Sequence, residues 1–158
     1  MSPVLKYRDP VSGLWVALPA TAWPPNEVVS QVNGAGGAST TSLAYVDWPP
    51  SGYGGPLQAT LNKRMNSTLV VVSLTVSSWH SSGAQVNYAV SIDGAAATSV
   101  IQCYYNTASD HRGWASSRAF SGLSAGPHTF KAQVKITSGT LSCDGNDTFS
   151  MSVREVSA

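Results

Sequence analysis

The chain has 158 residues, enough for one domain with a single core and a short appendage. Only 11% of the residues are charged, about half the usual share, and the formal net charge is +1. This balance leaves no broad basic field for nucleic-acid binding. No apolar run approaches the roughly 20 residues that a membrane-spanning helix requires, so we expect no membrane insertion.

The N-terminal stretch VLKYRDPVSGLWVALP predicts a β-hairpin. Residues 4–8 and 14–18 are strand-like, and the intervening DPVSG has the residues of a turn. An isolated two-stranded hairpin is only marginally stable in water, so its side chains need a surface to pack on. We therefore expect residues 1–19 to dock on another protein. The expected docking side chains are Tyr7, Leu14, Trp15, Val16 and Leu18.

A connector is predicted at residues 20–41. Prolines at its start, NGAGG in its middle and small polar residues at its end favour a linker, with a short ordered piece at residues 28–32. The head domain is then expected to occupy residues 42–158.

Turn residues recur at intervals typical of an all-β domain after residue 42, and no window shows a helical period. The segments between them predict an antiparallel β-sandwich, or jelly roll, of about eight strands, preceded by the hairpin and the linker. The expected strands are residues 42–48, 57–64, 67–80, 84–94, 98–106, 114–123, 128–137 and 147–156.

The penultimate strand alternates strictly between apolar and polar residues. Its apolar set is expected in the core, whereas Lys131 and Lys135 are expected to face solvent or a neighbouring subunit. The apolar set consists of Phe130, Ala132, Val134 and Ile136.

The order of segments in the second half is SIDG, a variable stretch, RAFSGLSAGPHTFKAQVK, a polar loop and a terminal FSMSVREV. This order resembles the C-terminal domains of bacteriophage tail fibres and minor tail proteins, and related trimeric jelly rolls of the tumour-necrosis-factor-like kind. The N-terminal YRDPVSGLWVALP is similar to short segments at the start of phage tail and fibre proteins.

The resemblance implies a virion structural protein that is assembled in the host cytoplasm, forms a homotrimer and has other virion proteins as partners. No heptad or collagen-like shaft separates the hairpin from the head. We therefore expect a compact protein of the tail tip or the capsid surface, including a capsid decoration protein, instead of a long fibre.

The segment NTASDHRGW is the candidate ligand-binding loop. It combines charge, hydrogen-bonding groups and an aromatic ring, as binding sites on loops often do. A host cell-surface glycan could stack on Trp114 or Tyr105 while Asp110 and Arg112 bind its hydroxyls. In the alternative, Asp110 pairs with Arg112 and Trp114 anchors the loop on the sandwich. The candidate set is Tyr104, Tyr105, Asp110, His111, Arg112 and Trp114.

No catalytic signature appears in the sequence, which lacks a G-x-S-x-G elbow and a P-loop. His80, His111 and His128 have no metal-binding spacing, so a zinc site would have to be assembled by the fold. The polar segment CDGND is acidic, but it lacks the bidentate Glu and the spacing of an EF-hand. We expect a non-enzymatic protein without a metal or a cofactor.

Two pairs of residues have two interpretations each. Cys103 and Cys143 could form a disulfide if their strands are neighbours, but two buried thiols are the favoured interpretation for a reducing cytosol. Trp48 and Tyr53 lie in DWPPSGYGGP, which is too rich in proline and glycine for a strand. They are expected to cover an open edge of the core or to contact a neighbouring copy.

Overall fold

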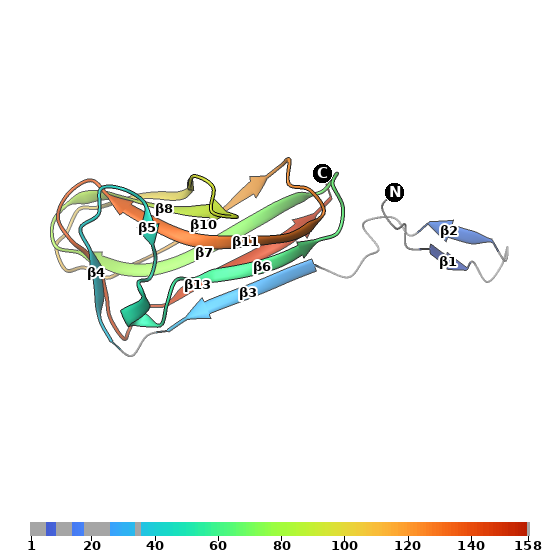
Figure 1. Cartoon of the computed structure of the whole chain (residues 1–158). Helices are drawn as coiled ribbons and strands as arrows, with labels where there is room; N and C mark the ends of the chain where they lie inside the picture. The colour runs from blue at the N-terminus through green and yellow to red at the C-terminus, as the bar shows by residue number, and fades with distance from the viewer. Residues whose placement is uncertain (1–5, 9–13, 18–25, 34–35, 158) are drawn as a thin grey trace.

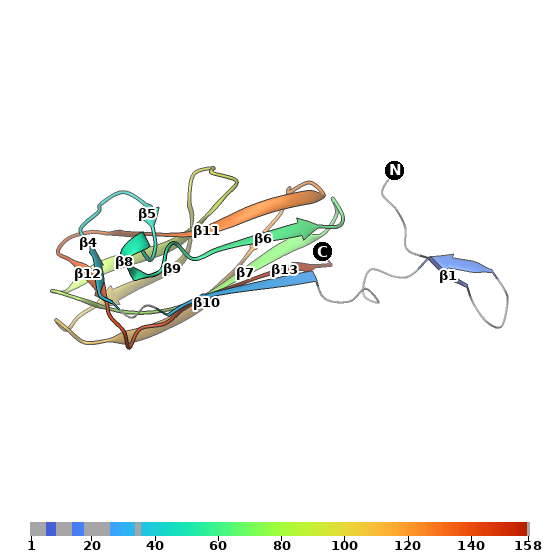
Figure 2. The ribbon, with the colours of Figure 1, turned by 60° about the horizontal axis from the view of Figure 1, so that its bottom comes forward.

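The computed structural model describes residues 6–8, 14–17, 26–33 and 36–157, and it is an antiparallel β-sandwich preceded by a short hairpin (Figures 1 and 2). The predicted fold class is therefore confirmed. One sheet of the sandwich has six strands and the other has five. The six-stranded sheet contains β3 (Asn26–Val32), β4 (Ala38–Thr40), β7 (Leu69–His80), β10 (Arg112–Phe120), β12 (Leu141–Cys143) and β13 (Phe149–Val156).

The five-stranded sheet is built around β11. Strand β8 pairs with one edge of β11, and β5 and β6 pair with successive parts of its other edge. Strand β9 pairs with β8 and ends the sheet. The strands are β5 (Val46–Asp47), β6 (Gln58–Lys63), β8 (Ala84–Ile92), β9 (Thr98–Tyr105) and β11 (Gly126–Ile136).

The core lies between the two sheets and follows the alternation of the sequence. In β11 the predicted apolar set is buried, with exposures of 0 to 6%, and the intervening residues lie on the outer face. In β7 the side chains of Val70, Val72, Leu74 and Val76 are likewise buried. Buried and less buried side chains alternate along both strands, because one face of each sheet lies against the core and the other does not.

One end of the core is covered by the segment between β5 and β6. Trp48 and Tyr53 are each 1% exposed, and Tyr53 belongs to the 3-10 helix η2 (Ser51–Tyr53). Both rings meet Phe149 edge to face, with centroid distances of 6.0 Å for Trp48 and 5.7 Å for Tyr53. These aromatic residues therefore cover the core within one chain.

The predicted connector is wrong at residues 26–32 and 38–40, because two strands of the six-stranded sheet lie there, and the ordered piece predicted at residues 28–32 is part of the first of them. Strand β3 pairs with β13 over seven residues, and β4 pairs with β12. Val28 and Val32 pack against the core from the edge of the sheet. The sequence concealed these strands because the flanking prolines and glycines dominate the pattern, and NEVVSQV does not alternate between polar and apolar residues although its burial does.

The number of strands also differs from the prediction. The eight predicted strands correspond to β5 to β11 and β13, and β3, β4 and β12 bring the sandwich to eleven. The predicted strand at residues 42–48 is shorter in the structure and corresponds to β5. The chain bends before it, where the Ser42 Oγ donates a hydrogen bond to the carbonyl of Ala44 at 2.7 Å. Strand β12 was missed because its three residues are too few to show a pattern.

The N-terminal hairpin is present as a two-stranded sheet of its own. Strands β1 (Lys6–Arg8) and β2 (Trp15–Ala17) pair in antiparallel register, with Tyr7 opposite Val16. Leu14 is 68% exposed. The predicted turn at residues 9–13 and the docking residue Leu18 lie outside the described residues.

Both cysteines are buried free thiols, Cys103 in β9 and Cys143 in β12. Burial raises the pKa of each thiol to about 12. The favoured interpretation of two unpaired thiols is therefore confirmed. Over the described parts of the chain, no helix is long and apolar enough to cross a bilayer.

Candidate functional site

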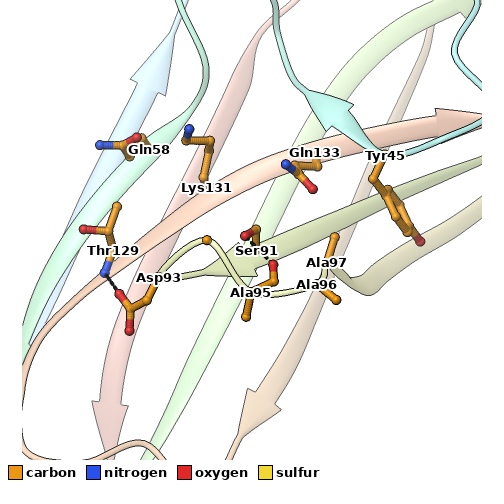
Figure 3. Close-up of a pocket in the computed structure, with 11 residues that line it drawn as sticks. Tyr45, Gln58, Ser91, Asp93, Ala95, Ala96, Ala97, Thr129, Lys131 and Gln133 are labelled. Atoms are coloured by element: carbon orange, nitrogen blue, oxygen red, sulfur yellow. Dashed lines mark hydrogen bonds between the residues drawn. The ribbon is translucent and has the colours of Figure 1, made fainter.

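A polar groove of about 650 Å³ lies on the outer face of the five-stranded sheet. Figure 3 shows Gln58, Lys131 and Gln133 along one side and the alanines of the β8–β9 loop along the other. Tyr45 lies at one end, and Asp93 with Thr129 lies at the other. The volume is within the range of small-molecule sites, roughly 300–1,000 Å³.

Strand register builds the floor of the groove. Lys131 of β11 lies between Gln58 of β6 and Ser91 of β8, so three polar side chains form one row across the sheet. Two residues further along β11, Gln133 lies opposite Asp47 of β5. Because alternate residues of a strand share a face, Thr129, Lys131 and Gln133 of β11 all face this groove.

Asp47 orients the polar side chains of the floor. Its two carboxylate oxygens accept a hydrogen bond from Lys131 Nζ at 3.0 Å and one from Gln133 Nε2 at 2.9 Å. Beside the Tyr45 end, Lys135 Nζ lies 4.7 Å from the centre of the Tyr45 ring. The floor therefore presents oriented ammonium and amide groups next to an aromatic ring.

The opposite end of the groove is closed by a turn that Asp93 holds in place. Asp93 and Gly94 have φ values of 53° and 78°, and the Ala95 N–H donates to the carbonyl of Ile92 at 2.9 Å. Asp93 Oδ1 accepts the Thr129 N–H at 2.8 Å. Asp93 and Gly94 therefore form a tight turn after β8, and this turn is the start of the groove wall.

His128 pairs with the second oxygen of Asp93, at 2.6 Å from Nδ1 to Oδ2. The hydrogen bond to Asp93 raises the pKa of His128, and the bond to the carbonyl of Ser124 adds to this effect. In return, the His128 hydrogen bond lowers the pKa of Asp93. The pair therefore holds the turn after β8, which forms the groove wall, against strand β11.

The chemistry of the groove suits a neutral or weakly acidic polar ligand. Gln58 is exposed, and its amide makes no hydrogen bond to another described residue. Lys131 keeps two ammonium protons beyond the bond to Asp47. Amide, ammonium and hydroxyl groups beside an aromatic ring are the groups that bind polyhydroxylated ligands.

In the predicted binding loop, the charged residues pair with each other. Arg112 Nε donates to Asp110 Oδ2 at 2.9 Å, which is the pairing of the alternative interpretation. Trp114 packs against the core, with its ring edge to face with Tyr105 at 6.2 Å. The loop is therefore anchored as that alternative describes.

The two predicted tyrosines are placed differently. Tyr104 is 59% exposed, whereas Tyr105 is fully buried. The Tyr105 hydroxyl lies 2.7 Å from Ser78 Oγ, and burial raises the pKa of its phenol. Tyr105 therefore lies in the core, beneath any surface ligand.

His111 turns away from its neighbours in the sequence and toward the β12–β13 loop. Its Nδ1 lies 3.1 Å from Asp147 Oδ1, and its Nε2 lies 3.5 Å from Asp144 Oδ2. The ring also contacts Trp79, at a centroid distance of 6.2 Å. The predicted set is thus divided between a salt bridge, a core aromatic pair and a separate His–Asp cluster.

The groove was not among the predicted sites. Its sequence signal was the polar half of the alternation at residues 131–135, which indicated a wet face without indicating what lies beside it. Gln58 and Ser91 join Lys131 only through strand pairing, which the sequence pattern does not determine.

Comparisons with known proteins give information on the fold. No family model matches the chain, and no curated protein matches it. Among solved structures, Eiger TNF from S. frugiperda is similar at 15% identity and a TM-score of 0.49, over 84% of this chain and 95% of that chain. Infectious bursal disease virus, Gx strain, is similar at 10% identity and a TM-score of 0.53, over 98% of this chain and 37% of that chain.

The infectious bursal disease virus VP2 subviral particle is similar at 8% identity and a TM-score of 0.45, over 97% of this chain. The chain spans 42% of that VP2 chain, so it is less than half as long as either virus chain. At such identities a likeness shows the fold alone. The chain is a jelly-roll β-sandwich, and it shares this fold with a chain of infectious bursal disease virus.

Proposed function

We propose that the chain is a non-enzymatic structural component of a bacteriophage particle, located at the tail tip or on the capsid surface. Its N-terminal hairpin docks on other virion proteins, and its sandwich is displayed for assembly or host attachment. The observation that carries this proposal is the β1–β2 sheet, which among the described residues is hydrogen-bonded to neither sheet of the sandwich.

A free two-stranded hairpin buries little surface and is only marginally stable in water. The hairpin here pairs over three residues in each strand, and Leu14 beside it is 68% exposed. A partner surface would stabilise the paired strands by burying their side chains. The fold shared with a virus protein also supports a role in a virus particle, as does the resemblance of the hairpin segment to the start of phage tail proteins.

Composition of purified particles tests this proposal. Particles from a density gradient should contain the chain at a fixed ratio to the major coat protein, measured by quantitative mass spectrometry. A chain that stays in the soluble fraction, or whose ratio varies between preparations, would show that it is no structural component.

We further propose that the sandwich assembles as a homotrimer. Strand β10 pairs with β7 alone, and six of its residues, 113 and 115–119, are exposed, so one strand edge is open in the described chain. An open edge is a place where a second chain can pack. Light scattering should give a mass near three times 16.5 kDa, and a mass of one chain would contradict the trimer.

The groove favours a second candidate function, the recognition of a host cell-surface glycan. Lys131 and Gln133 supply donors that Asp47 orients, Gln58 supplies an exposed amide, and Tyr45 supplies a ring at the end of the groove. On a glycan array, Gln58→Ala and Gln133→Ala should each weaken binding. Tyr104→Ala is the matched control, since Tyr104 is exposed in the region predicted from sequence and lies outside the groove.

Three outcomes of this array are informative. Loss in the groove variants with the control unchanged supports glycan binding in the groove. Loss in Tyr104→Ala alone would move the site to the predicted loop. An array without specific binding would leave the groove without this function.

A further inference from the structure

We propose that His111, Asp144 and Asp147 form a binding site for one divalent transition-metal ion, of the class of Zn²⁺. One ligand atom from each of these three side chains lies within 4.8 Å of the other two. His111 comes from the turn before β10, and both aspartates come from the β12–β13 loop. The site is distinct from the groove and does not depend on the proposed function.

The present contacts already have the spacing of neighbouring metal ligands. His111 Nδ1 lies 3.1 Å from Asp147 Oδ1, and His111 Nε2 lies 3.5 Å from Asp144 Oδ2. Nitrogen and oxygen ligands about 2.1 Å from a tetrahedral Zn²⁺ are about 3.4 Å apart. The two contacts use different nitrogens of the imidazole, so the ring has to turn before one nitrogen faces an ion held by both carboxylates.

The loop that carries the carboxylates is held in one conformation. Asp147 N–H donates to the carbonyl of Asp144, and Asp144 N–H donates to Asp147 Oδ2, each at 2.9 Å. The Tyr53 hydroxyl lies 2.7 Å from the Asp144 carbonyl and 2.5 Å from that of Asp147. Such supporting hydrogen bonds orient the ligands of metal sites before the ion binds.

Hydrogen bonds also determine which oxygens remain for an ion. Asp144 Oδ1 accepts the Asn146 N–H at 2.9 Å, so Oδ2 is the oxygen that faces His111. Asp147 Oδ1 accepts the Ser77 hydroxyl at 2.5 Å and still faces His111. Each carboxylate therefore directs one oxygen toward the imidazole, as a mixed nitrogen and oxygen site requires.

The charge of the cluster favours a dication. Its two carboxylates form no ion pair with a lysine or an arginine among the described residues, because neighbouring Arg112 pairs with Asp110. Asp147 is 1% exposed, so its charge is poorly solvated by water. His111 and Asp144 are 40% and 42% exposed, which leaves a side open for ion entry and for bound water.

The ligand types select the metal class. Imidazole favours zinc and neighbouring transition metals, whereas calcium and magnesium prefer oxygen ligands only. With three protein ligands and an open side, the ion would tie the start of β10 to the β12–β13 loop. Binding to the folded state alone would then raise the unfolding temperature.

Zinc titration of the full chain, purified without a histidine tag and dialysed against chelator, tests the site. Calorimetry should find one Zn²⁺ per chain, and zinc should raise the unfolding temperature until EDTA is added. His111→Ala and Asp144→Asn should each weaken binding by roughly tenfold or more. Both positions are partly exposed, so neither change should unfold the protein.

His128→Ala is the matched control. His128 pairs with a single carboxylate, Asp93, so this variant should bind zinc as the unchanged protein does. No zinc binding by the full chain would overturn the proposal, as would unchanged affinity in both His111→Ala and Asp144→Asn, or equal loss in the control. If His111→Ala proves unfolded by circular dichroism, the Asp144→Asn result decides.

Discussion

His128 Nδ1 lies 2.6 Å from Oδ2 of Asp93, and this pair joins the β8–β9 turn to the start of β11. The contact raises the pKa of His128 and lowers that of Asp93. The stabilisation from His128 is complete below its unfolded pKa, about 6.5, and is lost as pH rises through its raised folded pKa. The stabilisation from Asp93 is lost as pH falls through its lowered pKa.

Replacing His128 should therefore matter most between roughly pH 4 and 6.5. We expect His128→Gln to lower the free energy of unfolding there by about 0.5 kcal/mol, since the pair is partly exposed. Urea unfolding of both proteins from pH 4 to 9 measures the difference. A difference that is as large above pH 8 as it is between pH 4 and 6.5 would contradict the account.

Glu155 should be important for stability at the end of the sandwich near β6 and β7. Although desolvation by burial would raise its pKa, hydrogen bonds lower it: from the Thr68 hydroxyl, the Asn26 amide and the backbone N–H groups of Arg64 and Met65. Glu155→Ala removes the shared acceptor and should cost about 2 kcal/mol.

Urea unfolding at pH 7 measures this cost. Because the pKa of Glu155 is lowered in the folded state, its stabilisation is present above its unfolded value and lost as pH falls through the folded one. The cost of Glu155→Ala should thus become smaller in acid. A cost under about 0.5 kcal/mol at pH 7, as for an ordinary surface change, would contradict the prediction.

Tyr53→Phe should loosen the β12–β13 loop without opening the core. The ring keeps its edge-to-face contact with Phe149, but the hydroxyl that faces the carbonyls of Asp144 and Asp147 is lost. We expect a loss of about 1–3 kcal/mol and faster hydrogen exchange at residues 144–149. Exchange unchanged in this loop would show that the hydroxyl does not hold it.

The two thiols should be unreactive in the folded protein. Burial raises the pKa of Cys103 and Cys143 to about 12, so almost no thiolate is present at pH 8. A thiol reagent such as DTNB should react slowly in native buffer and with both cysteines after urea unfolding. Fast native reaction, or fewer than two thiols in urea, would contradict this description.

The sequence predicted the strands whose burial alternates, because one side of each is dry and the other is wet. The apolar set of β11 was predicted residue by residue. Strand β4 was missed, and β3 was predicted only as a short ordered piece at residues 28–32, because edge strands bury less of their surface and prolines and glycines surround them. The position of the first sheet strand in the chain was therefore wrong.

The sites were harder to predict, because they depend on register and not on local pattern. The salt bridge of Asp110 with Arg112 is local, and one interpretation of the loop described it. Lys131 lies beside Gln58 because β11 pairs with β6. His111 lies beside Asp147 because two loops that are far apart in the sequence pack against each other. Such contacts between distant segments cannot be derived from spacing in one sequence.

The copy number of a hairpin deletion in purified particles tests the central claim most directly. The full chain and a chain lacking residues 1–20 are expressed from the same locus and counted against the major coat protein by mass spectrometry. The account predicts that the shortened chain keeps its β-sheet circular dichroism but is absent from particles. Incorporation of a folded, shortened chain at the normal copy number would contradict docking through the hairpin.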